Sequence, residues 1–165
     1  MPHKTAGFTL IEMLVVLAII AILAMMAIPS TAPLKMRAQV AEIIQYVEPF
    51  KSNIESLYMA NEFEFPETNK LAGLPDADKL ISNQISSVEL RDGAFHIQLG
   101  NSVYPALQGK TISIQPLVVT DSPSSPIDWL CGLADEPKGM QAAGANRTNI
   151  ANSLLPNSCR GKVKD

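Results

Sequence analysis

The stretch that decides the fold lies at the start of the chain, from residue 7 to residue 30, and reads GFTLIEMLVVLAIIAILAMMAIPS. Between Phe8 and Ile28 every residue is apolar except Thr9 and Glu12. A helix over residues 8–28 would be about 31 Å long, which matches the hydrocarbon core of a bilayer. A carboxylate inside such a segment is costly, so Glu12 is marked as a functional residue that needs a partner.

The residues before the apolar run form a short polar leader. Residues 1–7 carry Lys4 and no acidic residue, so the positive-inside tendency predicts a cytoplasmic amino terminus. A secretory signal peptide has its small cleavage-site residues after the apolar region, whereas Ala6 and Gly7 stand before it. Cleavage at this junction would remove the leader and keep the apolar helix in the product.

The run from Gly7 to Glu12, GFTLIE, followed by an unbroken apolar segment and Pro29, resembles the class III signal of type IV pilins. The resemblance implies that a prepilin peptidase cuts between Gly7 and Phe8 and N-methylates the new amine of Phe8. It also makes Glu12 the fifth residue of the mature chain. We therefore expect residues 1–7 to be a leader peptide and residues 8–34 a helix for the membrane and the filament core.

A charge balance supports this role for Glu12. Cleavage after Gly7 creates a cation at Phe8, and a carboxylate in hydrocarbon is tolerable when it meets a cation. Glu12 could pair with the Phe8 amine of its own chain. The resemblance implies instead a pair with the amine of the next subunit, which would set the axial register. A third interpretation is that Glu12 only reaches the membrane interface near the helix end.

A second helical pattern follows, now with one apolar face. Apolar residues recur at intervals of three and four, at Met36, Val40, Ile43, Ile44, Val47, Phe50, Ile54, Leu57 and Tyr58. This spacing predicts an amphipathic helix over residues 35–60 that packs against a sheet. Pro29 and Pro49 should kink the helical run, because each removes a helical hydrogen bond and clashes with the preceding turn. The resemblance implies that the backbone between them can extend in the filament.

Alternating residues predict the strands. Residues 88–91 and 94–99 flank a hairpin turn at Asp92-Gly93, and alternation places His96 and Gln98 on the solvent side. Residues 111–115, extending toward Val119, give a third strand, and residues 127–131 a fourth. The expected fold is α+β: a roughly four-stranded antiparallel sheet on the C-terminal half of the long helix, with a head over residues 35–165.

Two cysteines, Cys131 and Cys159, lie near the carboxyl end. If one helix spans the membrane and the amino terminus is cytoplasmic, this region lies outside, where disulfides persist. A disulfide over this long loop is therefore expected, with two free thiols as the alternative. Neither cysteine has a second ligand at metal spacing, so no metal is expected. The sequences at residues 129–132 and 154–160 also resemble the end of the type IVa pilin head.

The remaining residues contain no catalytic pattern, so an enzyme is not expected. The only histidines are His3 and His96, and no glycine-rich phosphate loop follows a strand. With 13 basic and 16 acidic residues the net charge is −3, which does not indicate a nucleic-acid protein. No cofactor is expected. The resemblance implies a subunit of an extracellular type IVa pilus that passes through the inner membrane and supports adhesion, twitching motility or DNA uptake.

The same resemblance implies the partners: other pilins in a helical filament, the prepilin peptidase, an inner-membrane assembly platform, and host or abiotic surfaces. One alternative is a minor or competence pilin whose head binds DNA through Arg160, Lys162 and Lys164, joined by Lys138 and Arg147. A solvated basic tail is the simpler interpretation of these residues. Another alternative is a pseudopilin of a type II secretion system, which shares the amino-terminal signal.

Overall fold

The computed structural model describes residues 7–26 and 31–162, and the chain divides into two compact units, Met1–Ala32 and Pro33–Asp165. The first unit contains one helix, α1 (Leu10–Met26). Thr9 caps it, because the backbone N–H of Glu12 donates to Thr9 Oγ1 at 3.4 Å and that of Met13 donates to the Thr9 carbonyl at 3.3 Å. Pro29 and the kink predicted there lie outside the described residues.

The amphipathic segment forms two helices, α2 (Ala32–Gln45) and α3 (Glu48–Ala60), where one helix over residues 35–60 was predicted. Pro49 lies in the first turn of α3 and lacks the N–H that a continuous helix would direct at the carbonyl of Gln45. At the break the backbone hydrogen bonds span three residues in place of four, since the N–H of Tyr46 donates to the Ile43 carbonyl at 3.1 Å. The break therefore lies just before the proline.

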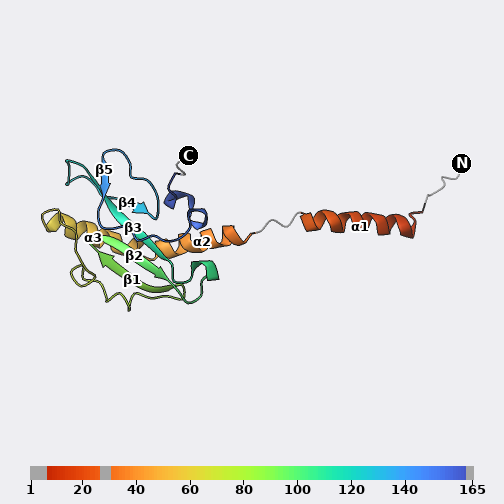
Figure 1. Ribbon diagram of the computed structural model, residues 1–165, viewed down its shortest axis with the longest axis horizontal. Helices are drawn as coiled ribbons and strands as arrows, with labels where there is room; N and C mark the ends of the chain where they lie inside the picture. Colours follow the sequence, from red (N-terminus) through yellow and green to blue (C-terminus); the bar gives the residue numbers. More distant parts are fainter. Residues whose placement is uncertain (1–6, 27–30, 163–165) are drawn as a thin grey trace. The chain divides into compact units, whose positions relative to one another are not determined.

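An antiparallel sheet completes the second unit (Figure 1). Its strands are β1 (Ile85–Arg91), β2 (Ala94–Leu99), β3 (Thr111–Val119) and β4 (Asp128–Cys131), in that order, and β5 (Met140–Ala142) pairs with β3. The α+β fold is confirmed, with five strands in place of the roughly four predicted. Asp92 and Gly93 have φ of 51° and 81°, which is the backbone of a tight hairpin turn whose twist matches the strands.

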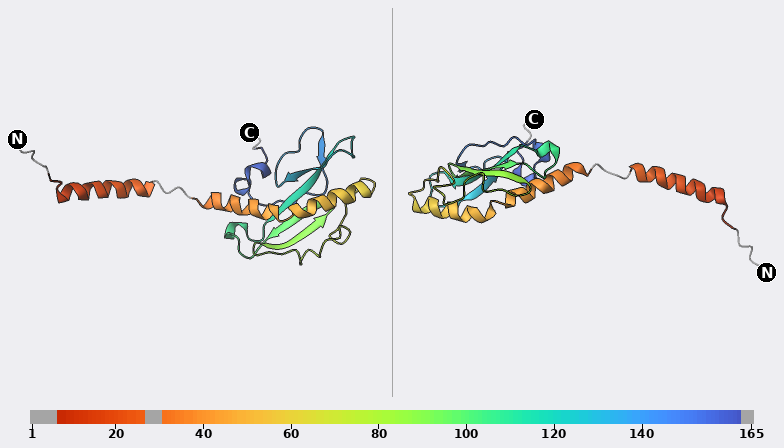
Figure 2. Two further views of the ribbon diagram at one scale, coloured as in Figure 1. Left: turned by 180° about the vertical axis from the view of Figure 1, so that it is seen from behind. Right: turned by 90° about the horizontal axis from the view of Figure 1, so that it is seen from below.

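The core of this unit lies between the two helices and one face of the sheet. The right-hand view of Figure 2 shows α2 and α3 running along one side of the sheet, which is seen there nearly edge-on. The helices contribute Val40, Ile43 and Ile54, the turn between them contributes Val47, and the sheet contributes Val88, Leu90, Phe95, Ile97, Leu99, Ile112 and Ile114. Each buried aliphatic or aromatic side chain stabilises the fold by about 1.5–3 kcal/mol.

The opposite face of the sheet is also covered, which corrects one prediction. His96 was expected to face solvent, but it is only 4% exposed. The segment of residues 146–149 follows the edge of β3, where the N–H of Thr111 donates to Asn149 Oδ1 at 2.7 Å and that of Ser113 to Thr148 Oγ1 at 3.0 Å. This distant segment shields His96, whereas Gln98 on the same strand is exposed as predicted.

Candidate functional site

The side chains of α1 form an apolar surface that nothing in its own unit covers. Residues 7–25 are all exposed, with Leu10 at 82% and Ile20 at 55%. The apolar residues surround the helix and form no single stripe. A helix of this kind needs lipid or other helices on every side. Small residues recur at Ala18, Ala21 and Ala24, and such positions let helices approach closely.

Glu12 is the one charged residue of α1, and its contacts are weak. Its carboxylate accepts a hydrogen bond from the Thr9 hydroxyl at 3.5 Å, and both side chains are exposed. Within the described parts of the chain Glu12 makes no ion pair. While Phe8 is still joined to Gly7 by a peptide bond, it offers no free amine. Thr9 Oγ1 both accepts the backbone N–H of Glu12 and donates to its carboxylate, a capping role of Thr9 that the sequence interpretation missed although the T-x-x-E spacing indicates it.

The predicted disulfide is confirmed. Cys131, at the end of β4, and Cys159 are joined by a 2.01 Å S–S bond with their Cα atoms 4.6 Å apart. The backbone reinforces this junction, since the N–H of Leu133 donates to the Cys159 carbonyl at 2.9 Å. Gly132 lies between them with φ of +61°, and a Cβ there would lie 2.9 Å from that same carbonyl oxygen. The disulfide thus fixes the carboxyl-terminal segment to the sheet.

The basic residues predicted to contact DNA do not form one free cluster. Arg160 is turned inward, where its Nε donates to the Leu155 carbonyl at 2.8 Å. Arg147 forms an ion pair with Glu89 at 2.8 Å. Lys138 and Lys162 are exposed, and Lys164 lies outside the described residues. DNA contact through these residues stays a prediction.

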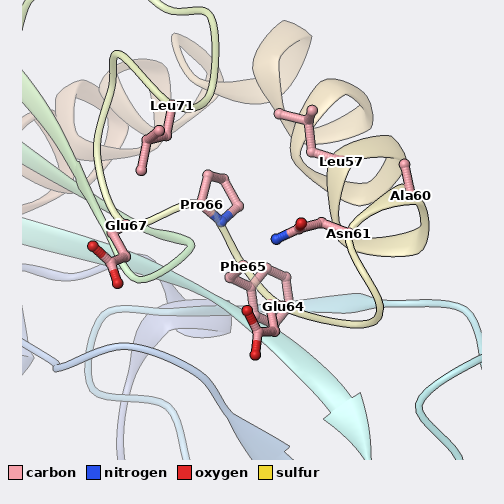
Figure 3. A pocket seen from close by; sticks show the side chains of 8 residues that line it. All are labelled: Leu57, Ala60, Asn61, Glu64, Phe65, Pro66, Glu67 and Leu71. Atoms are coloured by element: carbon pink, nitrogen blue, oxygen red, sulfur yellow. The ribbon is translucent and has the colours of Figure 1, made fainter.

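A groove opens at the carboxyl end of α3, and its lining residues are drawn in Figure 3. It has a volume of about 530 Å³ and is lined by Leu57, Ala60, Asn61, Glu64, Phe65, Pro66, Glu67 and Leu71. Phe65 is fixed by stacking on Tyr58, with ring centroids 4.3 Å apart. The lining offers two carboxylates but no histidine, cysteine, serine or lysine.

A polar cluster lies on the far side of the sheet, around His96. Its Nδ1 is 2.9 Å from Ser113 Oγ, and that oxygen also accepts the backbone N–H of Arg147 at 2.8 Å. Burial, followed by the charge of Arg147, lowers the pKa of His96 to about 4. The sequence interpretation missed this cluster, because the residues that enclose His96 are distant in the chain.

In residues 7–26 and 31–162, no three side chains among His, Cys, Asp and Glu come together to hold a metal ion. Across those same ranges, no helix combines the length and the apolar character needed to cross a membrane.

Comparison with known proteins identifies the family. Residues 36–160 match the family described as Pilin (bacterial filament), and residues 2–28 match the Prokaryotic N-terminal methylation motif. The chain belongs to the pilin family. It is a type IV pilin with a class III signal, in agreement with the apolar α1, the head built on α2 and α3, and the disulfide.

Relatives resemble this pilin along nearly its whole length. A fimbrial protein of Neisseria meningitidis serogroup B is 33% identical over 163 residues, which cover 93% of each chain. The type IV major pilin protein PilE1 of Neisseria gonorrhoeae is 34% identical over 160 residues, covering 93% of this chain and 86% of the relative. The chain is therefore a pilus subunit that polymerises with other pilins into an extracellular filament.

Proposed function

We propose that the chain is made as a precursor, cleaved between Gly7 and Phe8 by a prepilin peptidase, N-methylated on Phe8, and polymerised through α1. The observation that carries this proposal is the exposure of α1. Its side chains are apolar on all faces and uncovered in their own unit, so the helix is stable only among lipids or other helices. Polymerisation supplies those helices.

Glu12 gives the assembly its register in this proposal. Cleavage frees the Phe8 amine, and a neighbouring subunit offers Glu12 as its counter-charge. The carboxylate is exposed and, in the part of the chain that the structure describes, held only by a 3.5 Å contact to Thr9, so it can exchange that contact for an ion pair at little cost. Inside a packed bundle of apolar helices an unpaired charge is strongly unfavourable, which excludes subunits that join out of register.

Before assembly, the subunit would reside in the inner membrane as a single-pass protein with a cytoplasmic amino terminus. An assembly platform would then move it into the filament. Transfer from lipid to a helix bundle keeps the apolar side chains buried, so little hydrophobic free energy separates the two states. This balance would let filaments grow and be withdrawn.

The filament, in this proposal, is structural and not enzymatic, and it serves adhesion, twitching motility or DNA uptake. The relatives named as fimbrial protein and type IV major pilin favour a pilus subunit over a secretion pseudopilin. Deletion of the gene, followed by assays of surface attachment, twitching and transformation, separates the three activities. Loss of filaments with all three activities intact would contradict their assignment to the pilus.

The experiment that tests the processing is mass spectrometry of filaments sheared from the cell surface. The amino-terminal peptide should begin at Phe8 and carry one methyl group. The membrane fraction of a strain without the peptidase should instead contain a chain that keeps residues 1–7. Filaments whose subunits retain Met1, or whose Phe8 is unmodified, would contradict the proposal.

A further inference from the structure

Three strands place a row of polar side chains on the face of the sheet opposite the helices. In the register of the strands, His96 of β2 lies beside Glu89 of β1 and beside Ser113 of β3. Arg147 crosses this row from the segment that follows β5. Its backbone N–H donates to Ser113 Oγ and its Nη1 donates to Glu89 Oε2, both at 2.8 Å. Arg147 therefore binds both outer members of the row, Ser113 through its backbone and Glu89 through its side chain.

The hydrogen bonds of Ser113 favour one of the two neutral tautomers of His96. Ser113 Oγ accepts the N–H of Arg147, and the hydroxyl proton must then find an acceptor. In the described residues His96 Nδ1, at 2.9 Å, is the acceptor within reach. If Nδ1 accepts this proton, the neutral imidazole carries its own proton on Nε2. Nε2 is buried and has no hydrogen-bond partner in the part of the chain that the structure describes.

A buried N–H without an acceptor costs free energy, so this position calls for a group that accepts a hydrogen bond. The side chain of His96 forms part of the wall of a cavity of about 220 Å³, which we call the His96 pocket. Its lining residues are Ser87, Glu89, His96, Gln98, Thr111 and Arg147. This volume accommodates several non-hydrogen atoms, so the acceptor can belong to a small ligand.

The charges around the His96 pocket bear on the sign of that ligand. Glu89 accepts hydrogen bonds from two guanidinium groups, Arg91 at 3.0 Å and Arg147 at 2.8 Å. These three groups together carry one net positive charge, and the carboxylate of Asp92 also acts on His96 and on Arg91. His96 adds no charge near neutral pH, because burial and the charge of Arg147 lower its pKa to about 4. A cation would meet the Arg147 guanidinium in the pocket wall, whereas an anion can accept hydrogen bonds from it.

The other lining groups are also suited to an anion. Ser87 donates to Gln98 Oε1 at 3.3 Å, which leaves the side-chain NH₂ of Gln98 as a donor. The hydroxyl of Thr111 and the free nitrogen of the Arg147 guanidinium add further donors. We propose that the His96 pocket binds a small oxyanion, a carboxylate or phosphate group, which accepts hydrogen bonds from His96 Nε2 and from Arg147.

The test is nitrogen-15 NMR of the full chain in detergent micelles, labelled at its two histidines, His3 and His96. Sodium acetate and sodium phosphate are titrated separately at neutral pH, with sodium chloride at the same ionic strength as the reference. We expect a saturable shift of His96 Nε2 with at least one of the oxyanions, while His3 responds as it does in chloride. A His96 signal that acetate and phosphate leave as it is in chloride would show that only water occupies the site, and would overturn the proposal.

Two variants and a matched control make the test specific. Arg147→Gln should weaken binding by about tenfold or more, because a charge-assisted hydrogen bond is lost. Gln98→Leu keeps the charge, the Arg147 contacts and His96 in place, and should weaken binding by a smaller factor. Lys162→Gln makes the same change in charge at an exposed residue away from the pocket lining and should leave binding unchanged. Equal weakening by Lys162→Gln and Arg147→Gln would overturn the proposal, since it would indicate a response to overall charge.

Discussion

Two helical regions of this pilin differ in what covers their apolar side chains. The helices α2 and α3 carry an apolar stripe, and the sheet of the same unit covers it, so that Val40 and Ile54 are fully buried. The helix α1 is apolar on every face, and its side chains remain exposed within its own unit. A helix with one apolar face can bury that face against its own chain, whereas a helix that is apolar on every face needs other molecules to cover it.

The charged residues of the two regions differ in the same way. In the head, Glu55 of α3 accepts the indole N–H of Trp129 at 2.8 Å, and the Lys51 ammonium lies 5.3 Å from the centroid of the same ring. These polar groups join α3 to β4. In α1, Glu12 contacts only the Thr9 hydroxyl among the polar groups of the described residues. Charges in the head therefore serve the fold, and the charge in α1 is available for assembly.

The disulfide provides the largest expected effect on the head alone. Cys131→Ser with Cys159→Ser should lower the free energy of unfolding of the head by roughly 3–4 kcal/mol, because the bridge closes a loop of 28 residues. Urea unfolding followed by the fluorescence of Trp129, the only tryptophan, measures this change. The helicity of α1 in detergent should be unaffected. Wild-type protein kept reduced is the control, and an unchanged unfolding midpoint in the double variant would contradict the expectation.

A pair of isoleucine substitutions compares the two regions directly. Ile54→Ala in α3 removes a fully buried side chain and should cost about 3 kcal/mol of head stability. Ile19→Ala in α1 removes a side chain that is 52% exposed, so head stability should stay unchanged while filaments become less resistant to heat. Urea unfolding and thermal dissociation of filaments measure the two effects. A loss of head stability in Ile19→Ala would break the comparison.

The sequence predicts the regular parts of this fold because they follow local periodicity. The strand of residues 94–99 was predicted with the same bounds as β2, and the turn at Asp92-Gly93 needs only a short-range backbone preference. Residues 140–142 form a strand through pairing with β3, since three residues in a glycine- and alanine-rich segment show no alternation of their own. Such pairing depends on the tertiary fold.

The functional residues also differ in whether a local sequence pattern reveals them. Glu12 is conspicuous in the sequence because a charge inside an apolar run violates a local rule, and Cys131 and Cys159 are evident from their chemistry. His96 violates no local rule, and alternation places it on the face away from the core. Its burial depends on residues 146–149, which reach it through hydrogen bonds to β3. Local sequence patterns alone do not predict that contact.

The burial of His96 predicts a smaller, pH-dependent effect on the head. Its pKa is lowered to about 4, so the unfolded chain takes up a proton at a higher pH than the folded chain does. Stability from this residue is complete above about pH 6.5 and decreases by about 2 kcal/mol as the pH falls toward 4. Urea unfolding at several pH values should show this slope in wild type and a shallower one in His96→Gln. Identical slopes in wild type and in His96→Gln would contradict the conclusion that burial lowers the pKa of His96.

The central claim is that α1 is an assembly element whose register is set by Glu12, and surface piliation tests it most directly. Cells that express Glu12→Ala at the wild-type level are examined by electron microscopy, and subunits are quantified in the membrane and sheared fractions. Thr9→Val, which removes the hydroxyl that caps α1 and contacts Glu12 but keeps the Glu12 carboxylate, is the matched control and should keep filaments. The account predicts that Glu12→Ala subunits stay in the inner membrane and form no filaments. Normal piliation by that variant would contradict it.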